Sequence, residues 1–216
     1  MAQVQTRVKT CGVTTLADAR RCASLGAWAI GLIFWPGSPR ACAVEDAEVI
    51  GAELRRELEL AGVFVNATLD EVALAADRCA LTLLQLHGDE GPAYCREAAR
   101  RTGCKVMKAA RVHSAAEVRA LQPFHTDFHL LDAYSPRSPG GTGESFDWEL
   151  AQLHPHDPPV VLSGGLTPDN VGRAVAAARP FAVDTASGTE AEPGRKDPAK
   201  LRAFFRAVEA ADRLAA

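Results

Sequence analysis

Short apolar runs alternate with amphipathic stretches along the whole chain. The apolar runs cover residues 8–11, 29–34, 61–65, 81–86, 106–110, 128–131, 160–162 and 181–183. Stretches with helical periodicity follow them in turn, at 15–25, 44–58, 69–78, 92–101, 115–121, 147–153, 168–178 and 198–210. The pattern therefore predicts eight strands and eight helices in strict alternation.

This alternation also indicates a fold class. Nearly continuous apolar strands are typical of a parallel sheet that is covered on both faces. Pro92, Pro168 and Pro198 stand where the first turn of a helix tolerates proline. An open doubly wound sheet could carry the same pattern. Eight units within 216 residues, with polar groups after many strands, favour an α/β fold of the closed (β/α)8 TIM barrel type, as a single domain over residues 1–216.

Composition excludes several classes of partner. The net charge is −3, so nothing indicates a nucleic acid or an acidic membrane surface. The first five residues lack the pattern of a signal peptide, and no apolar run approaches the roughly 20 residues that cross a bilayer. Six cysteines occur without C-x-x-C spacing. We therefore expect a cytoplasmic protein with reduced thiols, most of them buried in the core.

Three glycine turns follow the last three apolar runs, at residues 140–143, 163–165 and 187–188. Glycine lets backbone N–H groups approach an anion closely. In (β/α)8 barrels a phosphate is often bound after the seventh and eighth strands. The turns predict a phosphate site formed by Gly141, Thr142, Gly143, Gly164, Gly165, Ser187 and Gly188.

Two candidate acid–base groups end strands. Cys11 ends the first apolar run, and its thiolate could act as a general base if a neighbour lowers its pKa; Lys9 would point to the same side of the strand. Asp132 ends the sixth run in an apolar setting, where burial would raise the pKa and allow it to donate a proton. A packed thiol and a loop-capping carboxylate are the alternatives. Around a ring of eight strands the first and sixth are three steps apart, so a base and an acid could flank one sugar, as an aldose–ketose isomerisation requires.

Other polar residues follow the remaining strands. Arg40 could bind a substrate carboxylate through both arms of its guanidinium, or it could be solvated. His87, with Asp89 or Asp132, could ligate a metal, but His87 is part of no H-x-H or H-E-x-x-H spacing, so we expect no metal. His154 and His156 lie in a polar loop, and we expect them to face solvent.

The motifs resemble those of the phosphoribosylanthranilate isomerase family of tryptophan biosynthesis, over nearly the whole chain. The similar segments are Lys9-Thr10-Cys11-Gly12, Ser38-Pro39-Arg40, Gln85-Leu86-His87-Gly88-Asp89-Glu90, Leu130-Leu131-Asp132, Gly140-Gly141-Thr142-Gly143, Ser163-Gly164-Gly165, and Val183-Asp184 with Ser187-Gly188, Glu190 and Pro193-Gly194-Arg195-Lys196-Asp197. The resemblance implies a TIM barrel and an Amadori rearrangement of N-(5-phosphoribosyl)anthranilate to 1-(2-carboxyphenylamino)-1-deoxyribulose 5-phosphate.

The resemblance also implies residue roles. Cys11 would be the general base at the ribose C2′ hydrogen, and Asp132 the general acid on the ring oxygen. Arg40 would hold the anthranilate carboxylate. Asp184 would orient the substrate, with Gln85 and His87 also binding it. No cofactor is implied, and the partner is a small sugar-phosphate substrate bound by a monomer or homodimer.

The chain departs from the family pattern at Thr10, Ala41, Glu144 and Ala186. Rival functions also remain open. A ribulose-phosphate epimerase is expected to use metal-binding histidines on several strands, and indole-glycerol-phosphate synthase to use lysines and a glutamate. A barrel that only senses a sugar phosphate would have no need of an acid–base pair.

Overall fold

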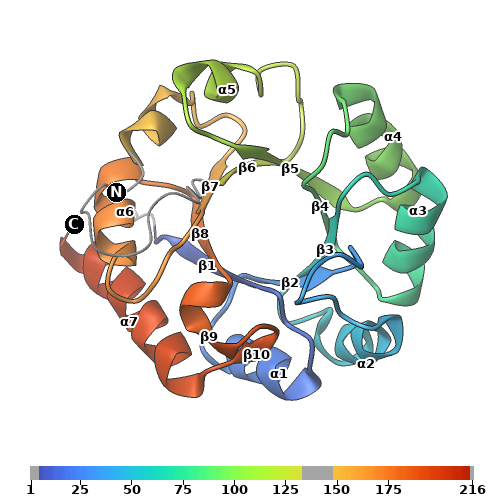
Figure 1. The fold of residues 1–216 in the computed structure, drawn as a ribbon, viewed down its shortest axis with the longest axis horizontal. Coiled ribbons are helices and arrows are strands. Elements are labelled where there is room, and N and C mark those ends of the chain that lie inside the picture. Colours follow the sequence, from blue (N-terminus) through green and yellow to red (C-terminus); the bar gives the residue numbers. More distant parts are fainter. Residues whose placement is uncertain (1–4, 133–147, 215–216) are drawn as a thin grey trace.

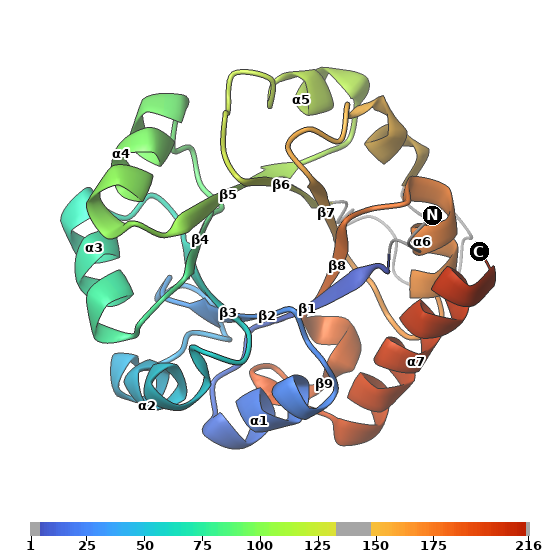
Figure 2. The same ribbon diagram turned by 180° about the vertical axis from the view of Figure 1, so that it is seen from behind.

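The computed structural model describes residues 5–132 and 148–214, and its central feature is a closed barrel of parallel strands (Figures 1 and 2). The strands follow one another around the ring in chain order, and the last pairs with the first. They are β1 (Arg7–Cys11), β2 (Ala29–Ile33), β3 (Glu59–Phe64), β4 (Leu83–Leu86), β5 (Lys105–Arg111), β6 (Phe128–Asp132), β7 (Val160–Ser163) and β8 (Ala182–Thr185). The predicted (β/α)8 barrel is confirmed, and the open sheet is excluded.

Helices surround the barrel and cover the outside of its strands (Figure 1). They are α1 (Leu16–Ser24), α2 (Val44–Leu54), α3 (Leu69–Arg78), α4 (Pro92–Thr102), α5 (Ala115–Arg119), α6 (Val171–Ala178) and α7 (Pro198–Leu214). Local signals fix several starts: Thr15 caps α1, and Thr68 with Glu71 forms a capping box at α3.

Three local details differ from the prediction. The helix expected at 147–153 is a 3₁₀ helix, η1 (Trp148–Leu153). The helix expected from Pro168 begins only at Val171, because the Asn170 side chain accepts a hydrogen bond from the Thr167 N–H and holds the preceding residues in a turn. A second 3₁₀ helix, η2 (Ser187–Thr189), and a hairpin of β9 (Glu190–Glu192) and β10 (Arg195–Lys196) precede α7.

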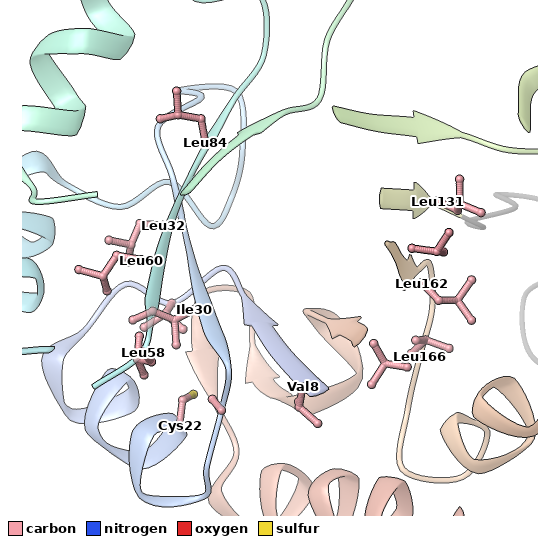
Figure 3. Packing of buried hydrophobic residues seen from close by; sticks show 14 of the residues in the cluster. Val8, Cys22, Ile30, Leu32, Leu58, Leu60, Leu84, Leu131, Leu162 and Leu166 are labelled. Atoms are coloured by element: carbon pink, nitrogen blue, oxygen red, sulfur yellow. The ribbon is translucent and has the colours of Figure 1, made fainter. Parts of the chain in front are cut away.

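The core has an outer and an inner layer. Outward-facing side chains such as Val8, Ile30 and Leu162 pack between the strands and the helices (Figure 3). The inner layer fills the barrel with Ala61, Leu83, Met107, Ala109, Phe128, Leu130, Val161 and Ala182. At the amino-terminal end of the strands, the rings of Trp28, Phe128 and Phe181 pack with centroids 5.1–5.3 Å apart. This end of the barrel is therefore closed by aromatic packing.

No disulfide links the six cysteines, all of which lie within the described residues. Cys104 is half-buried, and the others are buried. Within residues 5–132 and 148–214 no helix combines the length and apolarity that a bilayer crossing needs.

The expectation that His154 faces solvent is wrong. His154 is buried, and its Nε2 lies 2.8 Å from Nδ1 of buried His129 on β6. His129 Nε2 in turn lies 2.8 Å from the Phe124 carbonyl oxygen, and His154 Nδ1 accepts from the His156 N–H at 3.0 Å. This chain of bonds is satisfied when both imidazoles are neutral, with His129 donating to Phe124 and His154 donating to His129.

We predict that this histidine pair makes the fold sensitive to acid. Burial, followed by the neighbouring His129 and His156, lowers the pKa of His154 to about 4, and burial lowers that of His129. The unfolded chain therefore binds more protons, so stability is complete above about pH 6.5 and falls as the pH drops toward 4, by at most about 1.4 kcal/mol per pH unit for each group. Urea unfolding between pH 4.5 and 7.5 measures the slope.

A pair of variants tests the source of that slope. His154→Gln keeps a donor and an acceptor but cannot be protonated, so the slope should decrease. The matched variant His113→Gln removes an exposed histidine that does not affect the pKa of either member of the pair, and it should keep the wild-type slope. Equal slopes in the two variants would contradict the assignment.

Candidate active site

Most of the predicted functional side chains lie at the carboxyl-terminal end of the barrel. Cys11 and Asp132 are the last residues of β1 and β6. Going from β1 through β8 and β7 to β6 takes three steps around the ring. The two groups thus stand at the same end of the barrel, on opposite flanks of its mouth, as an acid and a base around one ligand require.

Cys11 belongs to a buried charged cluster that also contains Lys9. Lys9 Nζ lies 3.0 Å from Asp184 Oδ1, and Ser163 Oγ donates to Asp184 Oδ2 at 3.3 Å. Lys9 is fully buried, and Cys11 and Asp184 are nearly so. Burial opposes the charge of Lys9, but Asp184 and then Cys11 outweigh it, so the pKa of Lys9 is raised and the side chain stays an ammonium.

The state of the Cys11 thiol reflects opposing effects. Burial raises the pKa of Cys11, while the charge of Lys9 lowers it and that of Asp184 raises it. The pKa remains above its ordinary value overall, whereas the sequence-based hypothesis asked for a lowered one. The departure at Thr10 has no direct effect on this thiol, because Thr10 faces Cys22 of α1 on the other side of β1.

Arg40 is held at the rim by a carboxylate and is only partly exposed. Its Nε lies 2.9 and 3.0 Å from the two carboxylate oxygens of Glu190, and its Nη2 lies 2.9 Å from Oε2. The aliphatic part of Arg40 lies over Gly12, where a Cβ would come within 2.8 Å of its Cδ. Gly12 also has a φ of 73°, so glycine satisfies both the backbone and the close approach.

Lys196 connects this rim to the thiol strand. It is buried, and its Nζ donates to the Cys11 carbonyl at 2.7 Å, to the Ala186 carbonyl at 3.1 Å and to Glu190 Oε1 at 3.2 Å. Burial raises the pKa of Glu190, but Arg40 and Lys196 outweigh it, so the net pKa is lowered. Glu190 therefore stays ionised between two cations.

On the opposite flank, His87 links Gln85 to Asp132. Gln85 Nε2 lies 3.4 Å from His87 Nδ1, and His87 Nε2 lies 3.3 Å from Asp132 Oδ2. Gln85 and Asp132 therefore each contact one nitrogen of the His87 ring. The structure thus brings three predicted site residues together.

The predicted phosphate site is described only in part. Gly141, Thr142 and Gly143 lie outside the described residues, as does the departure at Glu144. Gly164 and Gly165 follow β7 with φ of 98° and 62°, and the Cβ position of Gly165 faces open space. Gly165 can therefore present its N–H group to a ligand.

Gly188 has a different local reason to be glycine. A Cβ there would lie 2.0 Å from the Leu166 carbonyl oxygen, so η2 packs directly on the loop after β7. This contact brings Ser187 and Gly188 next to the loop of Gly164 and Gly165. The predicted turns after β7 and β8 thus share one side of the rim.

Sequence reasoning missed the roles of Glu190 and Lys196, and it left Lys108 unassigned. Lys108 Nζ binds Glu90 Oε2 at 2.9 Å and the Gly88 carbonyl at 2.6 Å, which ties β5 to the loop after β4. Glu190 and Lys196 stand within a segment that matched the family motif, but only the fold shows that they contact Arg40 and Cys11.

In the described part of the chain, no group of three or more His, Cys, Asp or Glu side chains is placed to hold a metal ion.

Comparisons with known proteins show similarity to one family of barrel enzymes. Residues 8–207 match the family model described as N-(5'phosphoribosyl)anthranilate (PRA) isomerase. The chain is 51% identical over 197 residues to N-(5'-phosphoribosyl)anthranilate isomerase of Citrifermentans bemidjiense, covering 91% of this chain and 94% of that protein. It is also similar to the crystal structure of phosphoribosyl anthranilate isomerase from Thermotoga maritima, with a TM-score of 0.84, 39% identity and coverage of 95% and 100%.

A further similar structure is a phosphoribosyl anthranilate isomerase in complex with reduced 1-(o-carboxyphenylamino)-1-deoxyribulose 5-phosphate. Its TM-score is 0.82 at 37% identity, covering 95% of this chain and 100% of that one.

We predict that Gly188 is required for packing and that Gly165 is not. In Gly188→Ala the new methyl group would overlap a backbone carbonyl that cannot rotate away, so η2 must move, and we expect a loss of at least about 2 kcal/mol. Gly165→Ala meets no neighbour and should lose only about 1 kcal/mol through its positive φ. Chemical denaturation measures both. A smaller loss for Gly188→Ala than for Gly165→Ala would contradict the packing assignment.

Proposed function

The chain belongs to the N-(5'-phosphoribosyl)anthranilate isomerase family, and from this premise we propose that Cys11 and Asp132 are the general base and general acid of its reaction. The protein is an isomerase of tryptophan biosynthesis. It converts N-(5-phosphoribosyl)anthranilate to 1-(2-carboxyphenylamino)-1-deoxyribulose 5-phosphate by an Amadori rearrangement.

The proposed chemistry needs one proton donor and one proton acceptor. Asp132 donates a proton to the ring oxygen, the C1′–O bond breaks, and the nitrogen lone pair forms the C1′=N iminium. Cys11, as the thiolate, then removes the C2′ hydrogen, and the electron pair moves through C1′ to the nitrogen to give an enolamine. Ketonisation of the enolamine, with a proton returned to C1′, gives the aminoketose. The position of the two groups on opposite flanks of the mouth is the observation that carries this proposal.

Other rim residues bind and orient the substrate in this proposal. Arg40 binds the anthranilate carboxylate through the guanidinium edge that Glu190 leaves available. Asp184 orients the ribose from the β8 side. Gln85 and His87 act beside Asp132 on the other flank.

The phosphate is assigned to the turns after β6, β7 and β8. The open Cβ position of Gly165 and the contact of Gly188 with the loop after β7 support a backbone N–H site on that side. In this proposal the phosphate lies on the arc between Cys11 and Asp132, and the ribose ring extends over the mouth between them. The location in the cytoplasm, the monomer or homodimer, and the extension of the one domain through residues 1–216 stay predictions.

The acid–base assignment predicts that removing either group, Cys11 or Asp132, lowers kcat to a similar extent. Cys11→Ser replaces the thiol with a hydroxyl of far higher pKa, and Asp132→Asn cannot donate a proton. Each should lower kcat by about 10²- to 10⁴-fold, because a general acid or base typically contributes that much. The loss of substrate fluorescence on turnover measures kcat, and product titration measures binding, which both variants should retain.

Two outcomes would contradict this assignment. Turnover near the wild-type rate in Cys11→Ser would remove the thiol from the mechanism. A collapse of affinity with an unchanged kcat in Asp132→Asn would make Asp132 a binding group.

The Glu190 contact predicts a change in substrate affinity. Glu190→Gln weakens the ion pair with Arg40, so the guanidinium is less well oriented for the substrate carboxylate. We therefore expect KM to rise about 3- to 10-fold while kcat changes little. The matched variant Glu97→Gln removes a carboxylate that also binds two arginines, but on the surface of α4. It should leave both constants unchanged. A wild-type KM in Glu190→Gln would show that the contact does not position Arg40.

A further inference from the structure

Lys9 is the most unusual residue inside the barrel. It has no exposed surface, and its side chain shares the inner face of β1 with Cys11, two residues further on. A buried ammonium is costly unless it is paired and hydrogen-bonded. Asp184 supplies one partner at 3.0 Å from the directly paired position on β8. A lysine ammonium has three N–H donors, and the contact with one carboxylate oxygen of Asp184 leaves the others available.

Gly31 shows where the second contact of Lys9 lies. Gly31 pairs with Cys11 across β1 and β2, and a methyl group at Gly31 would lie 2.6 Å from Cys11 Sγ and 3.0 Å from Lys9 Nζ. The sulfur and the ammonium nitrogen therefore converge on one small space that glycine leaves free. The charge of the ammonium lowers the pKa of the thiol, against the effect of burial.

A base that is proposed to remove a carbon-bound hydrogen must be a thiolate, and the burial of Cys11 favours the thiol. Other charges also face this residue. Asp184 opposes the thiolate, while Lys196, which donates to the Cys11 carbonyl, supports it. Among these charges the effect of Lys9 on Cys11 is the largest. Arg40 and Glu190, which also lie at this part of the rim, bind each other.

We propose that Lys9 is a positioning residue of the isomerase, whose ammonium, oriented by Asp184, lies beside the Cys11 sulfur and stabilises its thiolate form against the effect of burial. This inference rests on the proposed role of Cys11 as the base. The base is then a pair, in which the thiolate of Cys11 is accompanied by the ammonium of Lys9. Asp184 also has a second role, because it binds Lys9 in addition to the substrate.

Thiolate absorbance near 240 nm tests the inference without turnover. The signal of Cys11 is the difference between each protein and the same protein carrying Cys11→Ser, recorded from pH 6 to 11. Lys9→Met keeps the length of the side chain but removes its charge, so the midpoint of the Cys11 titration should rise by about one pH unit or more. The acid limb of the kcat profile should move upward by the same amount, giving about tenfold less activity at neutral pH and recovery in alkali.

Two further variants separate a specific effect from damage to the fold. Lys108→Met removes another buried lysine that binds a carboxylate at 2.9 Å, on β5, and should leave the Cys11 midpoint unchanged. If Lys9→Met does not fold because Asp184 is left unpaired, Lys9→Met with Asp184→Asn removes both charges. The midpoint should still rise, because Lys9 affects the thiol more than Asp184 does.

The outcomes are distinct. An unchanged midpoint in both Lys9 variants, or an equal rise in Lys108→Met, would overturn the role of Lys9. Wild-type turnover in Cys11→Ser would overturn the proposed base instead, whatever the titration shows.

Discussion

The pairing of β1 with β8 is the constraint on which the rest of this structure depends. It joins the first strand to the last and closes the barrel, with Lys9 directly opposite Asp184. Both side chains are buried, and their ion pair crosses the closing seam. A slip by one residue would leave both charges buried without partners, which typically costs several kcal/mol. The pair thus fixes the register of closure, although a buried ion pair by itself adds little stability.

Closure divides the inside of the barrel into two regions. At the amino-terminal end, Trp28, Phe128 and Phe181 pack as an apolar plug. At the carboxyl-terminal end, the inward side chains of the strands include Lys9 and Lys108, each bound to a carboxylate. Stability is therefore concentrated at one end and chemistry at the other, a division that is general in this fold.

The segment after β8 makes the rim a connected unit. Lys196 of β10 donates to the Cys11 carbonyl, and Glu190 of β9 binds Arg40 from the loop after β2. Residues far apart in the chain are thereby held over the end of β1. This hairpin explains how a single arginine on a long loop keeps a defined orientation before any ligand binds, which lowers the entropic cost of binding.

The sequence by itself determined the repeating strands and helices, and it identified the strand ends that carry Cys11 and Asp132, because hydrophobic periodicity and order around a ring are properties of the chain alone. Only the tertiary structure decided what surrounds those groups. Burial of His154, the contact of Glu190 with Arg40 and the pairing of Lys9 with Asp184 all join residues on different elements. Such contacts depend on strand register and side-chain packing across the barrel, which no local pattern in the sequence encodes.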